Sequence, residues 1–488
     1  MNPPPPTHEL RRDLAQLAGL AFAYRLLFLI AVPRVLDTAD AIHYVETAAS
    51  FASGIFLGHD PKIPPFYPLL GALFSKLPLA DLEWGCRLVS FAAATLLVIP
   101  VYLLAREIHG RSTARVAGLV VALWPWLADY GCSVSTESLA ALLWLTAVYL
   151  LVRGARRGGW ALYGGAAAFC ALSLTRPEGL FLFMCAAPAV AILLWPPDRA
   201  SARRLAPLAI VFALFIMAST AFNQALAGRA TANYRVGFIL AEFDWVRFAH
   251  TGVETLSNVV PVMLGPVLFF FLGAGFLLPR QRPRDFRLEC CVLLFAFAQW
   301  AVSLFVLSPA PRYLMAPLIV FSLWSASGIV LTSARLAQAD HGARLLRLIP
   351  LLAIIAFQAV QAAITIGSEH LGRLPREPRE YKLAGQWMSE NLAHGLIFTR
   401  KPQVGFYAGM PSTGPAEGES LEAMLNRARA AGARYLVVDE RYTAAMAPPL
   451  RPLLDPANAP ADLTHLQSFE PWPGGRVTIY EIAGAQAP

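Results

Sequence analysis

Two carboxylates lie at the ends of apolar segments, where a membrane-bound site would be open to water. Asp40 follows the first apolar segment by a few residues, and Glu137 follows Thr136 at the start of the fourth. A carboxylate in the first turn of a helix is favoured by the helix dipole, so capping alone would account for Glu137. A solvated loop position would equally account for Asp40. Within hydrogen-bond reach of a substrate hydroxyl, either carboxylate would act as a general base.

Three cations accompany these acids in the sequence. Lys62 lies in a proline-rich stretch, and Arg176 and Arg312 are the only basic residues of two short connections between apolar segments. Pairing with Glu178 or with a lipid headgroup would explain the arginines structurally. Together, however, such cations can hold a phosphate group at a membrane surface.

A metal site is a weaker interpretation of the same region. His43, His59 and Asp60 could join Asp40 as ligands, but their spacing matches no strong metal-binding pattern. We therefore assign no metal-binding residue and leave open a divalent cation as cofactor.

The elements that position these residues are mostly apolar. With 56% hydrophobic residues among 488, the composition is that of a multi-span membrane protein rather than an enzyme with one anchor. A hydrocarbon core takes about 20 helical residues to cross, and several of the apolar segments are shorter than this. Eleven transmembrane helices are expected, at Leu17–Leu36, Leu88–Ala105, Ala114–Ala128, Ser138–Val152, Trp160–Leu174, Gly179–Trp195, Leu205–Leu226, Val260–Leu278, Leu288–Leu307, Tyr313–Ser333 and Leu345–Gly367.

The charges between these segments predict their orientation. Arginines gather on alternate connections, the first of which contains Arg11 and Arg12. Short loops rich in Lys and Arg stay in the cytoplasm because their translocation is unfavourable, so the N-terminus is expected inside and everything after Gly367 outside. The same rule accounts for the net charge of +8, and no pattern for binding nucleic acid remains.

Three regions of the outer face lie outside the predicted spans. The loop Asp37–Arg87 contains an apolar part, Phe66–Leu77, that is too short to cross and predicts an interfacial or re-entrant helix. The loop Ala227–Val259 has mixed charge and several aromatic residues. The third region is the tail, so we expect a membrane domain over residues 1–367 and a separate domain over residues 370–488.

The tail alternates helix and strand patterns. The helices are expected at Arg379–Leu392 and Leu421–Ala431, and the strands at Leu396–Thr399, Tyr435–Asp439 and, as an edge strand, Arg476–Ile482. About 110 residues can support a core of their own, and this alternation predicts a small α/β domain.

The order of these motifs resembles that of the GT-C superfamily of integral-membrane glycosyltransferases, especially the branch of protein O-mannosyltransferases and lipid A aminoarabinose transferases. The motifs are, in chain order, Asp40-Ala41-x-x-Tyr44, Pro64-Pro65-Phe66-Tyr67-Pro68-Leu69-Leu70, Thr136-Glu137, Arg176-Pro177-Glu178-Gly179 and Arg312-Tyr313. In the tail, Ala384-x-x-Trp387 and Phe406-Tyr407-Ala408-Gly409 extend the likeness over nearly the whole chain. Each motif is short, and the resemblance depends on their order and on their agreement with the predicted outer face.

The resemblance implies an enzyme that takes its sugar from a polyprenyl phosphate lipid. Asp40 matches the catalytic aspartate of the family and Glu137 its second acid, whereas Ala41 stands where some members have another acid. The residues that match groups near the carrier phosphate are Lys62, Arg176, Arg312 and Tyr313. The candidates for the rest of the substrate pocket are Tyr44, His59, Tyr67 and Glu178.

We therefore expect an inverting glycosyltransferase at the periplasmic face of a bacterial inner membrane. A carboxylate would accept the proton of the acceptor hydroxyl, and cations would stabilise the departing phosphate, so the general acid of glycoside hydrolases is not needed. The sequence specifies neither the sugar nor the acceptor, which is a glycan, a lipid or a protein. The alternatives are a flippase or exporter of lipid-linked glycans, and a non-catalytic carrier-binding scaffold. A transporter is less favoured because the ionisable groups gather at one surface rather than at mid-membrane.

Overall fold

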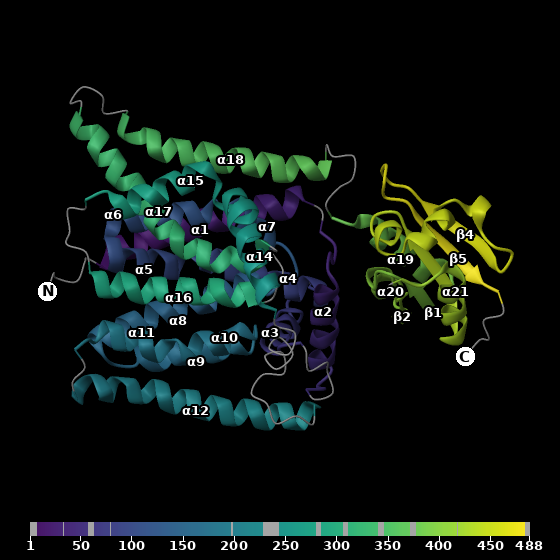
Figure 1. Cartoon of the computed structure of the whole chain (residues 1–488), viewed down its shortest axis with the longest axis horizontal. Coiled ribbons are helices and arrows are strands. Elements are labelled where there is room, and N and C mark those ends of the chain that lie inside the picture. Colours follow the sequence, from purple (N-terminus) through teal and green to yellow (C-terminus); the bar gives the residue numbers. More distant parts are fainter. Residues whose placement is uncertain are drawn as a thin grey trace. The chain divides into compact units, whose positions relative to one another are not determined.

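The computed structural model divides into two compact units (Figure 1). The first, here called the helical unit, comprises Met1–Leu29 and Tyr44–Ala362, and the second, the sheet unit, comprises Ile30–His43 and Ala363–Pro488. The sheet unit thus combines the C-terminal tail with the short segment that carries Asp40. The structure describes residues 7–32, 34–56, 63–78, 80–196, 199–227, 244–279, 285–305, 311–339, 346–370, 377–416 and 418–483.

Helices make up most of the described part of the helical unit, as the apolar segments predict. Each predicted segment overlaps at least one helix. The segment Ala114–Ala128 is divided between α6 and α7, because Pro125 cannot continue α6 and begins α7 instead. The helices are α1 Thr7–Ala31, α2 Ala39–Ala52, α3 Phe66–Phe74, α4 Leu82–Leu96, α5 Val98–His109, α6 Arg111–Ala122, α7 Pro125–Gly131, α8 Glu137–Arg157, α9 Ala161–Ser173, α10 Glu178–Met184, α11 Ala186–Leu193, α12 Arg199–Ala227, α14 Trp245–Glu254, α15 Val260–Leu277, α16 Phe286–Phe305, α17 Pro311–Ala339 and α18 Ile349–His370.

Seven helical stretches within the described residues are long and apolar enough to cross a membrane. They are His8–Ala31, Leu82–His109, Glu137–Arg157, Leu205–Phe222, Trp245–Leu277, Arg312–Gln338 and Leu346–His370. Two shorter apolar stretches, Ala161–Ser173 and Glu178–Leu193, lie between them in the chain. In Figure 1, α12 and α18 run along opposite edges of the helical unit. The chain is therefore confirmed as a multi-span helical membrane protein, and the number of eleven spans stays a prediction.

The apolar part of the first loop forms the short helix α3. With nine residues it is too short to cross a membrane. It packs closely against α4, because a Cβ atom on Gly85 would lie only 2.4 Å from the carbonyl oxygen of Gly71. The hydroxyl of Tyr67 donates to the carbonyl of Cys86 (2.8 Å) and lies 2.9 Å from Ser90 Oγ. The helix is thus a fixed part of the helical unit.

One charged residue, Arg25, is fully buried within α1. Its guanidinium donates to the carbonyl oxygens of Ala21 (3.0 Å), Ala122 (2.9 Å) and Val121 (3.2 Å). Ala122 and Val121 end helix α6, where backbone carbonyls have no partner within the helix. Arg25 therefore satisfies backbone groups inside the unit, which is a structural role.

The sheet unit contains the α/β domain that the tail predicts. Its sheet has the order β2-β1-β3-β5-β4, in which β1 pairs in parallel with β2 and β3, and β5 pairs antiparallel with β3 and β4. The strands are β1 Leu396–Thr399, β2 Ser412–Thr413, β3 Ala433–Asp439, β4 Leu463–Phe469 and β5 Val477–Ile482. The helices are α19 Arg379–Asn391, α20 Gln403–Ala408, α21 Leu421–Ala430 and α22 Thr443–Met446.

The predicted edge position of Arg476–Ile482 is wrong. Its strand, β5, lies between β3 and β4 and is buried on both faces. The true edge is β4, whose polar sequence Leu-Thr-His-Leu-Gln-Ser-Phe gives weak strand patterning, with His465 exposed. The other predicted helices and strands of the tail are confirmed.

Candidate active site

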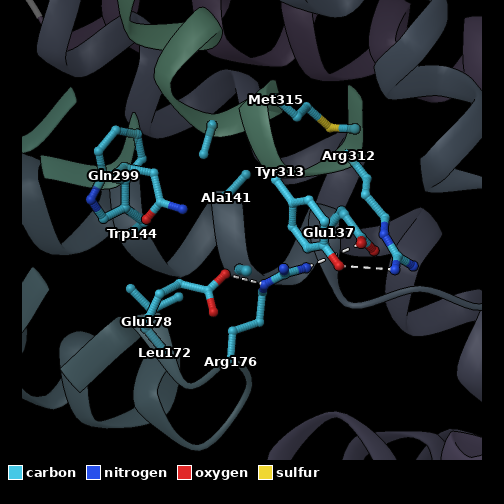
Figure 2. Close-up of a pocket in the computed structure, with 12 residues that line it drawn as sticks. Glu137, Ala141, Trp144, Leu172, Arg176, Glu178, Gln299, Arg312, Tyr313 and Met315 are labelled. Atoms are coloured by element: carbon cyan, nitrogen blue, oxygen red, sulfur yellow. Dashed lines mark hydrogen bonds and ion pairs between the residues drawn. The ribbon is translucent and has the colours of Figure 1, made fainter. Parts of the chain in front are cut away.

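A hollow in the helical unit is built where α8 and α17 begin and where α9 turns into α10 (Figure 2). Its charged side chains and Tyr313 lie together on one side, and Gln299 and Trp144 lie across from Arg312 and Tyr313. The lining residues are Glu137, Ala140, Ala141, Trp144, Leu172, Arg176, Glu178, Gln299, Arg312, Tyr313, Met315 and Ala316.

The guanidinium of Arg176 lies between two carboxylates in this hollow. Its Nη1 donates to Glu137 Oε1 (3.1 Å) and to Thr136 Oγ1 (3.3 Å), and its Nε donates to Glu178 Oε1. The side chains of Arg176 and Glu178 are each 14% exposed and that of Glu137 is 6% exposed, so these charges are largely removed from water. Burial acts to lower the pKa of Arg176, but Glu178 and Glu137 outweigh it and the pKa lies above its ordinary value. The arginine is thus permanently charged and fixed in direction.

A second guanidinium shares an aromatic ring with the first. Arg312 Nη2 donates to the hydroxyl of Tyr313 (3.0 Å), and its guanidinium lies 4.9 Å from the centre of the Tyr313 ring. The guanidinium of Arg176 lies 5.4 Å from the same ring. Cations near an aromatic face are stabilised by its quadrupole. Figure 2 shows both arginines beside Tyr313 on one side of the hollow.

The local sequence explains why these side chains meet. Glu137 is in the first turn of α8, where the dipole favours an acid, and Glu178 is likewise in the first turn of α10. Arg176 lies in the turn between α9 and α10, directly before Pro177, which precedes the first residue of α10. The first turns of α8 and α10 therefore bring two carboxylates into contact with the guanidinium on the turn between α9 and α10.

The start of helix α3 is hydrogen-bonded to the chain just before this turn. The backbone nitrogen of Phe66, at the start of α3, donates to the carbonyl of Leu174 (2.9 Å). On the other side, Ser90 Oγ donates to the carbonyl of Ser135, two residues before Glu137 (2.8 Å). Motifs that lie far apart in the sequence are thus joined around the hollow.

The structure places the remaining candidates differently. Tyr44 contacts Tyr67 edge to face, with ring centres 5.2 Å apart. Tyr67 is fully buried and its hydroxyl is engaged by α4, which indicates packing rather than substrate contact. Asp40 belongs to the sheet unit and lies in the first turn of α2. Lys62 and His59 lie outside the described residues.

Some lining residues were missed by the sequence analysis. Gln299 is a buried amide within an apolar span, which was a usable signal for a site. Trp144 and Met315 gave no such signal, because an aromatic or apolar side chain in a span is ordinary. Within the described residues, no group of three or more His, Cys, Asp or Glu side chains is placed to hold a metal ion.

Comparison with known proteins gives one family match over part of the chain and a set of similar folds. Residues 62–222 match the family described as dolichyl-phosphate-mannose-protein mannosyltransferase. No curated protein sequence matches the chain significantly.

Three solved structures illustrate the structural likeness. ArnT from Cupriavidus metallidurans matches at 14% identity over 99% of each chain, with a TM-score of 0.60. The oligosaccharyltransferase AglB from Archaeoglobus fulgidus matches at 15% identity over 99% of this chain and 75% of that one, with a TM-score of 0.62. Arabinofuranosyltransferase AftD from Mycobacteria matches at 17% identity over 97% of this chain and 40% of that one, with a TM-score of 0.54. These matches confirm the fold that the resemblance implied.

Proposed function

We propose that this chain, which shares the fold of the GT-C membrane glycosyltransferases, transfers a sugar from a polyprenyl-phosphate donor to an acceptor. The observation that carries the proposal is the hollow in which two arginines share the Tyr313 ring, with one of them held between two carboxylates. Guanidinium groups bind phosphate oxygens in a planar, two-pronged geometry, so this arrangement suits the phosphate of a lipid carrier.

The chemistry of the hollow and of related folds supports a lipid-linked donor. ArnT has been solved with undecaprenyl phosphate bound, and AglB with a dolichol-phosphate. Here the hollow has apolar lining beside its charges, including Ala140, Leu172 and Met315. A polyprenyl phosphate combines these two properties in one molecule. The transferred sugar is a hexose or a pentose.

The proposed reaction is a direct displacement. The oxygen of an acceptor hydroxyl attacks the anomeric carbon, its proton passes to the carboxylate of Asp40, and the bond between the anomeric carbon and the phosphate oxygen breaks. The products are the glycosylated acceptor and polyprenyl phosphate, with inversion at the anomeric carbon. Arg176 and Arg312 stabilise the negative charge that develops on the phosphate, and Lys62 is proposed to assist them.

Glu137 and Glu178 are proposed to act on Arg176 rather than on the sugar. Each carboxylate accepts a hydrogen bond from the guanidinium, so both fix its direction before a donor binds. This assignment gives the second acid of the family motif a positioning role and leaves proton transfer to Asp40.

The proposed setting is a bacterial inner membrane. The arginine-rich connections favour a cytoplasmic N-terminus, and we propose that the hollow and the C-terminal domain face the periplasm. A donor carried in the outer leaflet would reach the hollow from the bilayer, while the acceptor would arrive from the periplasm.

Deletion of the gene tests this proposal. We expect mass spectrometry of the deletion strain to show one polyprenyl-phosphate sugar accumulating and one envelope component lacking a sugar of the same mass. The wild-type gene should restore both. Purified protein in detergent, given the accumulated lipid and the unmodified component, should then form the product. Restoration in cells without transfer in detergent, where membrane sides no longer exist, would instead indicate a flippase.

A further inference from the structure

The segment Arg34–Asp37 leads to Asp40. Its backbone is hydrogen-bonded to side chains from the C-terminal part of the sheet unit. The backbone nitrogen of Leu36 donates to the hydroxyl of Tyr407 (2.8 Å). One residue further on, the carbonyl of Asp37 accepts from Gln403 Nε2 (3.1 Å). Leu36 is 0% exposed and Gln403 is 1% exposed, so each of these bonds has one buried partner. Hydrogen bonds therefore fix two successive residues of a segment that forms neither helix nor strand.

A buried ion pair holds the start of the same segment. Arg34 Nη1 lies 3.0 Å from Glu377 Oε1, with side-chain exposures of 4% and 3%. The other oxygen of Glu377 accepts from the backbone nitrogen of Val35 (3.3 Å). Glu377 is itself held, because its backbone nitrogen donates to Glu369 Oε2 (3.2 Å). The Glu377 carboxylate thus forms an ion pair with Arg34 and accepts a hydrogen bond from the backbone of Val35.

The short helix α20 supplies both contacts at the end of the segment. Gln403 and Tyr407 are four residues apart, which places them on the same face of the helix. The helix packs tightly against α19, since a Cβ atom on Gly385 would lie 2.6 Å from the Cβ atom of Tyr407. The two side chains that hold the segment therefore stand on a rigid support.

The held segment leads directly into the helix that carries the proposed base. The hydroxyl of Thr38 accepts from the backbone nitrogen of Ala41 (3.1 Å) and so caps the start of α2. Asp40 is the second residue of that helix. Asp40 therefore lies only three positions after Asp37, the last residue whose backbone carbonyl accepts a hydrogen bond from the C-terminal part of the unit.

We infer that the C-terminal part of the sheet unit positions Asp40, with Glu377, Gln403 and Tyr407 as positioning residues. The inference rests on the proposed function, because it takes Asp40 as the base. Proton transfer requires the base within hydrogen-bond reach of the acceptor hydroxyl, and small displacements of a catalytic group are costly. The three positioning residues thus act on the reaction through the backbone that precedes α2, whereas Asp40 alone contacts the reacting hydroxyl.

Tyr407→Phe tests the structural half of the inference, because it removes only the hydroxyl that accepts from Leu36. In the full-length protein, we expect amide exchange of the peptide spanning residues 34–43 to accelerate at least tenfold. Gln403→Ala should do the same independently. Tyr435→Phe is the matched control, since its hydroxyl donates to the carbonyl of Ala393 within the same unit. It should leave exchange of this peptide unchanged.

The catalytic half is tested by transfer from the donor lipid that accumulates in the deletion strain. Tyr407→Phe and Gln403→Ala should lower kcat about tenfold or more and leave the affinity for undecaprenyl phosphate within twofold. Without a well-placed base, the acceptor must ionise by itself, so the remaining rate should rise roughly tenfold per pH unit above neutrality. General loss of folded protein would not produce that pH profile.

Two results would overturn the inference. The first is faster exchange in Tyr407→Phe with an unchanged kcat. The second is a lower kcat whose pH profile matches that of the wild type. Failure of the proposed function is a different result, namely undiminished transfer by Asp40→Asn with the wild-type segment intact.

Discussion

Arg176 lies in contact with two carboxylates, which together offset its charge. The three side chains therefore carry a net negative charge, and by themselves they would repel a phosphate that enters the hollow. Additional positive charge must come from Arg312, whose guanidinium lies over the same Tyr313 ring, and from Lys62 in the proposed assignment. We propose that Glu137 and Glu178 set the direction of Arg176, that Arg312 balances their charge, and that Lys62 supplies the positive excess.

Arg176→Lys tests this division of roles. A lysine keeps the charge but loses the planar group that contacts both carboxylates at once. We expect affinity for undecaprenyl phosphate to fall about tenfold, equivalent to about 1.4 kcal/mol, as measured by titration in nanodiscs. Arg153→Lys, at the opposite end of α8, is the control and should bind as the wild type does. Equal affinities for the two variants would remove Arg176 from the phosphate site.

Arg25 is a buried charge for which the structure indicates no chemical role. Arg25→Met should leave the carbonyls of Ala122 and Val121 without their partner, at a cost of about 2 kcal/mol in unfolding free energy. Thermal unfolding in detergent checks the loss, and undecaprenyl-phosphate binding by the folded fraction should not change. Loss of binding with unaltered stability would assign Arg25 to the site instead.

At the scale of elements, α3 and α4 form the support of the hollow. Helix α3 is tied to the Arg176 turn through Phe66, and α4 is tied through Ser90 to the residues before Glu137. Since the two helices approach at Gly85 and Gly71, any separation between them would move both attachments.

Gly85→Ala tests the importance of that approach. Its Cβ atom would lie 2.4 Å from the backbone oxygen of Gly71, so the helices must separate. Forcing atoms into a packed contact costs about 1–3 kcal/mol, and we expect a lower thermal midpoint together with reduced transfer. Gly273→Ala is the matched control, because nothing lies within 4 Å of its Cβ position. Equal midpoints for the two variants would show that α3 tolerates displacement.

The elements also show what the sequence could predict. Apolar length predicted the helices of the membrane domain, and alternating patterns predicted α19, α21, β1 and β3 of the tail, because both signals are local. The polar edge strand β4 and the short helix α20 were missed, since each depends on its neighbours for stability. The contact of Arg34 with Glu377 joins residues 343 positions apart, which no local pattern can reveal.

The site was predictable to a similar extent. Arg176, Arg312 and Glu137 were indicated because they are charged residues on short connections predicted to lie outside, where basic residues are disfavoured. The sequence could not show that Glu137 accepts a hydrogen bond from Arg176, nor that Tyr67 is buried and hydrogen-bonded within the helical unit. Both depend on the way α4, α8 and the Arg176 turn meet in space.

At the scale of the whole molecule, the proposed chemistry requires a fixed orientation in the membrane. Alkaline phosphatase folds only where its disulfides can form, so a fusion after Ala483 should be active and a fusion after Gly158 inactive. Enzyme activity of the two fusions in intact cells is the measurement. The reverse pattern would place the hollow on the cytoplasmic side and exclude an acceptor in the periplasm.

The measurement that bears most directly on the account is transfer by Asp40→Asn, compared with Asp37→Asn. Both variants remove one negative charge from the same short stretch, but only Asp40 lies in the first turn of α2 as the proposed base. We expect Asp40→Asn to lose at least a hundredfold in kcat while it still binds undecaprenyl phosphate, and Asp37→Asn to stay within threefold of the wild type. Wild-type turnover by Asp40→Asn would contradict the account.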